Sequence, residues 1–132
     1  NKREALENGK PLANFIFLGD LNTMGMNLTY SNKDVSGAEE IARLSKRLSR
    51  KGIQLRILPK THAATYWPRP NSRFKPGDLD HVVASEHLEF KSFDGSVVDV
   101  RGWVDEASDT AKHRWARNYS DHALLYFEVQ KV

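Results

Sequence analysis

The apolar runs of this chain are all short, and this restricts its fold more than any other feature. The clearest is 14–18, a continuous run with the sequence NFIFL that ends at Gly19. Aromatic and β-branched residues over this length are typical of a buried strand. Asp20 and Asn22 follow at its tip, and the two-residue period of an extended chain would direct both side chains to one side.

The rest of the chain predicts further strands and one helix. Ser36 followed by Glu39 is a capping-box pattern that begins a helix, and Gly52 is expected to end it. The segment 102–120 is expected to be a long loop. Five more runs predict strands, at 53–58, 64–67, 79–85, 96–100 and 122–129. One helix and six strands predict an α/β unit with one mixed sheet of about six strands.

Length and composition exclude several classes of protein. A chain of 132 residues suits one domain, and its 39% hydrophobic and 28% charged residues are ordinary for a globular protein. No apolar run approaches the ~20 residues of a membrane span. The absence of cysteine excludes disulfides and thiolate metal sites. Because the first residue is Asn1 rather than Met, we expect the chain to be a piece of a longer protein, and the compartment stays open.

The basic residues are unevenly distributed. The segment 41–77 holds ten of the 20 Lys and Arg residues and no Asp or Glu. Two interpretations are open: a solvated helix face followed by a polar loop, or a positive surface that faces a polyanion such as a nucleic-acid backbone. Three prolines and three basic residues fall within 68–77, so we expect an exposed, irregular loop there.

Three short polar motifs adjoin the predicted strands in the order GDLN (19–22), LDHV (79–82) and SDH (120–122). Alone, each is weak, because an Asp after Gly is usually a turn residue and a His beside a strand is usually structural. Together they supply carboxylate, amide and imidazole groups, which phosphodiester hydrolysis requires to activate water and stabilise phosphoryl charge. A Ser or Cys nucleophile is not indicated, and the five histidines lack zinc-ligand spacing.

As an ordered triplet, these motifs resemble the signature of the endonuclease/exonuclease/phosphatase superfamily over roughly 15–129. The resemblance implies that Asp20 orients or deprotonates the attacking water and that Asn22 binds the scissile phosphate. It implies that Asp80 pairs with the catalytic His122. It also implies that Asp121, with Asp20, is associated with a Mg²⁺ or Mn²⁺ ion.

The resemblance covers only the C-terminal half of the family fold, a two-sheet sandwich flanked by helices. The first half of that fold supplies an asparagine and a glutamate as principal metal ligands, and no matching motif precedes Asn14. We therefore expect residues 1–132 to form half of the sandwich. Their expected partners are the upstream half of the same domain or, for the piece alone, a second copy of itself.

DNA is the first expected substrate, cleaved by an endonuclease or exonuclease. Trp67, Arg69, Arg73 and Lys75 precede Asp80, and an aromatic among cations suits a nucleic-acid strand. Two alternatives stay open: a phosphatase or phosphodiesterase acting on phosphoinositides or sphingomyelin, and a non-catalytic binding module that keeps the fold. His81 is interpreted as a structural residue.

Overall fold

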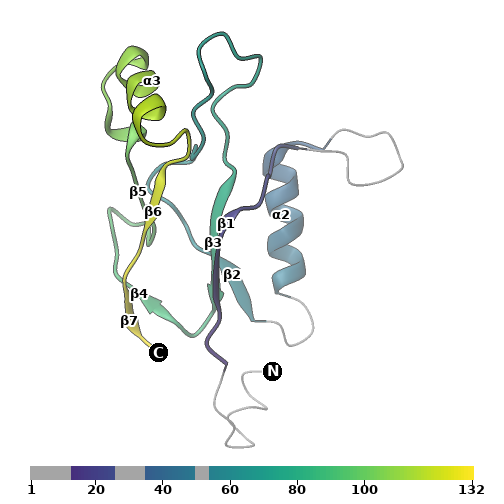
Figure 1. The fold of residues 1–132 in the computed structure, drawn as a ribbon. Coiled ribbons are helices and arrows are strands. Elements are labelled where there is room, and N and C mark those ends of the chain that lie inside the picture. Colours follow the sequence, from purple (N-terminus) through teal and green to yellow (C-terminus); the bar gives the residue numbers. More distant parts are fainter. Residues whose placement is uncertain (1–12, 26–34, 50–53) are drawn as a thin grey trace, which may run out of the picture.

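The structure is a computed structural model that describes residues 13–25, 35–49 and 54–132. This part of the chain forms two α-helices and seven strands, which confirms a mixed α/β class; Figure 1 shows their arrangement. The elements are β1 (Ile16–Asp20), α2 (Gly37–Leu48), β2 (Leu55–Ile57), β3 (Asp80–Ser85), β4 (Glu89–Phe90), β5 (Asp99–Arg101), a 3₁₀ turn η1 (Trp103–Asp105), α3 (Asp109–Asn118), β6 (Leu124–Tyr126) and β7 (Val129–Lys131).

The expected single mixed sheet of six strands is wrong. Within the described residues the strands form one three-stranded sheet, in the order β1-β3-β2, and two ribbons, β4-β7 and β5-β6. Every pairing is antiparallel. The later strands are only two or three residues long and pair with one another rather than with an edge of the first sheet.

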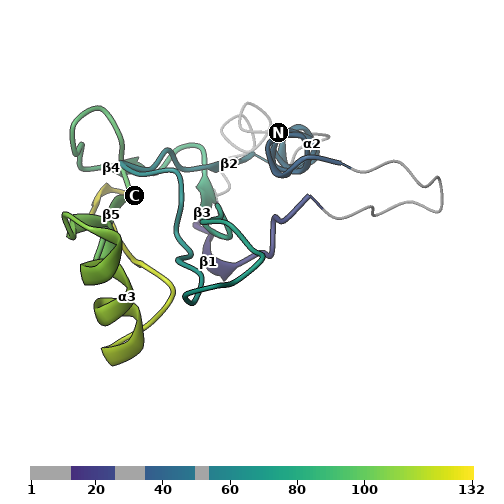
Figure 2. The same ribbon diagram turned by 90° about the horizontal axis from the view of Figure 1, so that it is seen from above.

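Strand β3 is the centre of the molecule, and all six of its residues are buried. Its alternating side chains face two directions. Val82 and Ala84 belong to a core cluster with Leu58 and Val98, against which Phe127 also packs. Figure 2 shows α3, β4 and β5 on one side of β3 and α2 on the other, with β1 next to β3. One face of β3 is therefore covered by the second half of the chain.

The prediction that 14–18 is a buried strand is correct in its secondary structure and wrong in its burial. Strand β1 is an edge strand whose only partner among the described residues is β3. Phe15 is 61% exposed and Leu18 is 54% exposed, although such side chains are usually buried. The apolar sequence is that of a covered strand, but no described element covers it.

Helix α2 begins as predicted. Ser36 is its N-cap, and the Ser36 hydroxyl accepts a hydrogen bond from the backbone N–H of Glu39. The helix contacts β2 and ends at Leu48, whereas the expected stop at Gly52 lies outside the described residues. Neither α2 nor any other described helix has the length and apolar character needed to cross a membrane.

Helix α3 corrects the expectation of a loop at 102–120. Ser108 caps it by accepting from the N–H of Ala111. Trp115 is its one large apolar side chain and packs on the cluster around Trp103, so the helix lacks the regular apolar stripe that sequence reasoning looks for. Gly102 makes room for this contact, because a Cβ there would lie 2.7 Å from the Trp115 ring.

Two further details of the strands differ from what the sequence predicted. The segment 64–67 is not a strand. Instead, Tyr66 forms isolated bridges with Gly77 and with His122. Strand β4 was not predicted, because two residues are too few to show a period. The segment between Tyr66 and Gly77 consequently forms a projecting loop, seen at the top of Figure 1 beside α3.

Candidate active site

The register of β1 on β3 brings the first two motifs together. Asp20 is the direct cross-strand partner of Asp80. Residues opposite each other in an antiparallel pair point to the same face. The N–H of Leu21 also donates to the carbonyl of Leu79 at 2.8 Å, which continues the pairing past the strand ends. Both carboxylates thus lie at the same end of the sheet.

The third motif adds an imidazole to these two carboxylates. His122 Nδ1 lies 2.8 Å from Asp80 Oδ2, and His122 Nε2 lies 4.0 Å from Asp20 Oδ2. Because a carboxylate can only accept, Nδ1–H is the donor to Asp80. Each nitrogen of the ring therefore faces a different carboxylate, one supplied by the buried strand β3 and one by the exposed strand β1.

The segment 65–67 holds His122 in this position. Ala123 N–H donates to the Thr65 carbonyl at 2.7 Å, and Trp67 N–H donates to the Asp121 carbonyl at 2.8 Å. Between them, the Tyr66 ring lies 5.4 Å from the His122 ring. These contacts pair the SDH motif with a segment that is distant in sequence.

Asp80 is anchored by two residues that sequence reasoning missed. The hydroxyl oxygen of Thr65, which is fully buried, accepts from the N–H groups of Leu79 and Asp80 at 3.1 and 2.9 Å. The Lys60 ammonium donates to the Asp80 carbonyl at 2.7 Å and to the Asp78 carboxylate. A threonine or lysine in a short polar segment carries no sequence signal for such a role.

Asp20 and Asn22 form a tight turn at the end of β1. Asp20 Oδ1 accepts from the backbone N–H of Asn22 at 2.8 Å, which leaves Oδ2 facing His122. Asn22 has a φ of 51°, a left-handed conformation that asparagine tolerates better than most residues. Both side chains are exposed and can reach a ligand.

The surroundings of His122 favour its charged form. Partial burial acts to lower the pKa of His122, but the hydrogen bond and negative charge of Asp80, with smaller contributions from Asp20 and Asp121, outweigh it. The net result is a pKa raised above the ordinary 6.5. A larger share of His122 is therefore imidazolium near neutral pH than for an isolated histidine.

His81 is close in sequence to Asp80 but faces the opposite side of β3. It is 2% exposed, and its Nε2 lies 2.8 Å from the Thr23 hydroxyl. That hydroxyl donates to the Asp78 carbonyl, so His81 must be the donor to Thr23. Burial and the nearby Lys60 ammonium lower the pKa of His81. These contacts support its interpretation as a structural residue.

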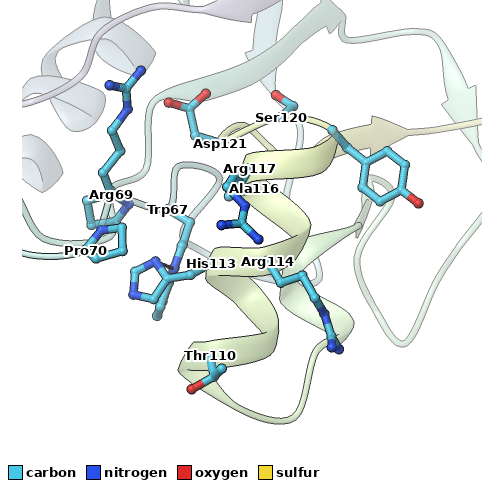
Figure 3. A pocket seen from close by; sticks show the side chains of 12 residues that line it. Trp67, Arg69, Pro70, Thr110, His113, Arg114, Ala116, Arg117, Ser120 and Asp121 are labelled. Atoms are coloured by element: carbon cyan, nitrogen blue, oxygen red, sulfur yellow. Dashed lines mark hydrogen bonds between the residues drawn. The ribbon is translucent and has the colours of Figure 1, made fainter.

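Of the four predicted substrate-binding residues, two line a common pocket and two lie outside it. Arg69 lines a pocket of about 910 Å³ between the projecting loop and α3, and Trp67 forms part of its wall (Figure 3). The Trp67 ring itself packs against Trp103, with centroids 5.2 Å apart. Arg73 lies over the Phe74 ring, outside this pocket, and Lys75 is exposed on the same loop.

A complete metal site is not formed by the part of the chain that the structure describes. Asp20 and Asp121 offer carboxylate oxygens, which suit Mg²⁺. No group of three His, Asp or Glu side chains in the described ranges is arranged to hold an ion. These residues fit only part of a magnesium shell, so the ligands of any such ion must include groups other than these.

Comparison with known proteins adds no relative. No model of a protein family matches the chain. No curated protein and no solved structure matches it either.

Proposed function

We propose that this chain is part of a metal-dependent phosphodiesterase that cleaves nucleic acid, with DNA as the first expected substrate. The observation that carries the proposal is the His122 ring, whose two nitrogens face the carboxylates of Asp80 and Asp20. Imidazole and carboxylate groups held side by side are suited to acid–base catalysis, and a site for phosphoryl transfer needs both. A non-catalytic module would need neither.

In the proposed mechanism His122 stabilises phosphoryl charge. Asp80 fixes the ring and favours its protonated form. Nε2–H then has no hydrogen-bond acceptor within the described residues, since the Asp20 oxygen is 4.0 Å away. It is available to donate to an oxygen of the scissile phosphate.

Asp20 activates the water in this proposal. The distance of 4.0 Å between Asp20 Oδ2 and His122 Nε2 is short enough for a water bound to Oδ2 to lie next to a phosphate oxygen bound by Nε2–H. A water there would lose its proton to Asp20 as its oxygen bonds to phosphorus. The ester P–O bond would break with its electron pair going to the leaving oxygen, which would take up a proton from solvent. Asn22 would donate to a phosphoryl oxygen from the same turn.

A divalent cation would neutralise charge on the phosphate when bound. Asp20 and Asp121 are the described residues whose oxygens suit it, and the remaining ligands would come from an upstream half of the same domain. The exposed apolar side chains of β1 support this two-part sandwich, because a second layer packed on them would remove them from water. The 132-residue chain alone is accordingly expected to be nearly inactive.

The test is hydrolysis of a fluorescent single-stranded DNA by the full-length protein, with Mg²⁺ or Mn²⁺ added and then removed by a chelator. We expect cleavage that stops on chelation and is lost in His122→Ala. Phosphoinositide and sphingomyelin substrates form the parallel arms. Hydrolysis of a lipid and not of DNA would move the proposal to that branch, and no hydrolysis of any phosphodiester would refute it.

A further inference from the structure

The pocket between the projecting loop and α3 is a charged site outside the catalytic cluster of Asp20, Asp80 and His122, none of which lines it. One wall is formed by 67–70. The other is one face of α3, where the lining side chains follow a spacing of three, four and seven residues: Thr110, His113, Arg114 and Arg117. Its volume of about 910 Å³ is within the range of ~300–1,000 Å³ usual for small-molecule sites.

The charge of this pocket favours an anion. Arg69, Arg114 and Arg117 line it, and Asp121 is the one acidic residue in its lining. None of the three arginines forms an ion pair with an acidic side chain in the part of the chain that the structure describes. Guanidinium groups bind phosphate oxygens through two parallel hydrogen bonds. A phosphate fits this set of donors.

His113 adds a neutral donor to the pocket. Its Nδ1 accepts from the Trp67 indole N–H at 3.0 Å, and an indole N–H can only donate. The ring proton of neutral His113 must therefore be on Nε2, on the other side of the ring from Trp67. Figure 3 shows His113 and Arg117 on α3 and Arg69 on the loop, with the Arg69 side chain extending away from the His113 ring, toward the side of the view where Asp121 lies.

The pocket begins directly beside the catalytic cluster. Asp121 is one of its lining residues and is followed at once by His122. The Trp67 N–H donates to the Asp121 carbonyl at 2.8 Å and so joins the loop wall to Asp121. Each nucleotide of a strand carries one phosphate, so the phosphate next to the scissile one is a single nucleotide away. A ligand held at His122 can therefore extend into the pocket.

We propose that this pocket binds a second phosphate of the substrate, next to the scissile one, through Arg69, Arg117 and His113. The inference rests on the proposed function, because it names a feature of that substrate. It makes the preferred substrate a strand with at least two phosphates rather than an isolated phosphodiester. The second phosphate is either an internal strand phosphate or a terminal phosphomonoester.

The experiment is a binding measurement on the 132-residue chain, which contains every residue of the pocket. A short fluorescent single-stranded oligodeoxynucleotide is titrated in fluorescence polarisation without metal, and binding is repeated at several salt concentrations. Arg117→Gln and Arg69→Gln are each expected to weaken binding about tenfold, or ~1.4 kcal/mol, and to reduce the salt slope by about one unit.

Arg114→Gln is the matched control. It removes the same charge from the same helix, but Figure 3 shows the Arg114 side chain directed away from His113, and it also lines a second hollow with Trp115 and Asn118. Its effect should be clearly smaller. Equal losses in Arg114→Gln and Arg117→Gln would overturn the proposal, because they would indicate general attraction to a basic surface. Unchanged thermal unfolding midpoints verify that all three variants fold.

Two further arms separate this proposal from the proposed function. An oligonucleotide with and without a terminal phosphate distinguishes the two sources. If Arg117→Gln weakens binding only when the terminal phosphate is present, the pocket binds a strand end. If it weakens binding of both oligonucleotides equally, the pocket binds an internal phosphate. In the full-length protein, Arg117→Gln should lower kcat/KM for the oligonucleotide and leave that for bis(p-nitrophenyl) phosphate, which has one phosphate, unchanged. Equal loss on both substrates would overturn the inference. Absent hydrolysis with intact Arg-dependent binding would refute the proposed function alone.

Discussion

Strands β1 and β3 are neighbours that each contain three consecutive apolar residues, yet their environments are opposite. All of β3 is buried, whereas four consecutive apolar residues, 15–18, are between 37% and 61% exposed on and just before β1. Each strand supplies one carboxylate to His122. Asp80 is consequently held in place by a packed core, whereas the position of Asp20 depends on an exposed edge strand.

The imidazole that joins the two strands should have the greatest effect on catalysis. We expect His122→Ala to lower phosphodiester turnover by ~10²–10³-fold in the full-length protein, since removing one positioned donor to the charge of the transition state costs this much. His87→Ala is the matched control, because His87 bonds Asn14 at the other end of the sheet. Steady-state hydrolysis with the unfolding midpoint checks both. Near-normal turnover in His122→Ala would remove this residue from the mechanism.

The same substitution placed in the core and on the edge strand should differ in its cost. Leu58 is 1% exposed and packs on the face of β3, so Leu58→Ala is expected to lower the free energy of unfolding by ~2–5 kcal/mol. Leu18→Ala in the 132-residue chain, at a concentration low enough to keep it monomeric, should cost less than ~1 kcal/mol, because that side chain is already largely in water. Urea unfolding measures both, and equal losses would mean that β1 is covered in solution.

The exposed edge of β1 should also promote self-association of the 132-residue chain. Unpaired backbone groups beside exposed apolar side chains are a template for pairing with another copy. We expect the mass measured by light scattering to rise with concentration towards a dimer, and Leu18→Lys to weaken that association. A chain that stays monomeric at high concentration would contradict this prediction, and Arg43→Lys on α2 controls for handling of the sample.

The two carboxylates should contribute unequally to the titration of His122. Asp80→Asn should lower the pKa of His122 more than Asp20→Asn does, because Asp80 makes the hydrogen bond. The pKa of His122 in the folded chain is raised above 6.5, so its ionisation stabilises the fold. This contribution to the free energy of unfolding is fully present below the pKa of the unfolded chain, and it is lost as the pH rises through the pKa of the folded chain. NMR titration of His122 measures the shift. A larger effect from Asp20→Asn would reverse the assignment of partners.

Local chemistry made part of this structure predictable. The cap at Ser36 and the strand that contains Asp80 follow from short-range patterns that need no tertiary information. The resemblance to the superfamily signature predicted that the motifs GDLN, LDHV and SDH lie close together. The structure does bring Asp20, Asp80 and His122 together.

The rest depended on contacts that are distant in sequence. Helix α3 is held by one tryptophan on a neighbouring cluster, and the anchoring of Asp80 by Thr65 joins residues 15 positions apart. The single large sheet was wrong because strand pairing is decided by which edges meet, not by the strands' own composition. The pocket on α3 was not predicted from the sequence, because the helix that forms one of its walls was expected to be a loop.

The alignment of Asp20 with Asp80 makes β1 intolerant of changes in length. A strand reverses its two faces when it slips by one residue. A one-residue insertion or deletion between Ile16 and Asp20 would therefore turn the Asp20 carboxylate away from His122 while leaving composition and charge almost unchanged. In a library of length variants, activity should disappear with an odd shift. A shift of two residues would return the Asp20 side chain to the original face, but Asp20 would no longer lie opposite Asp80.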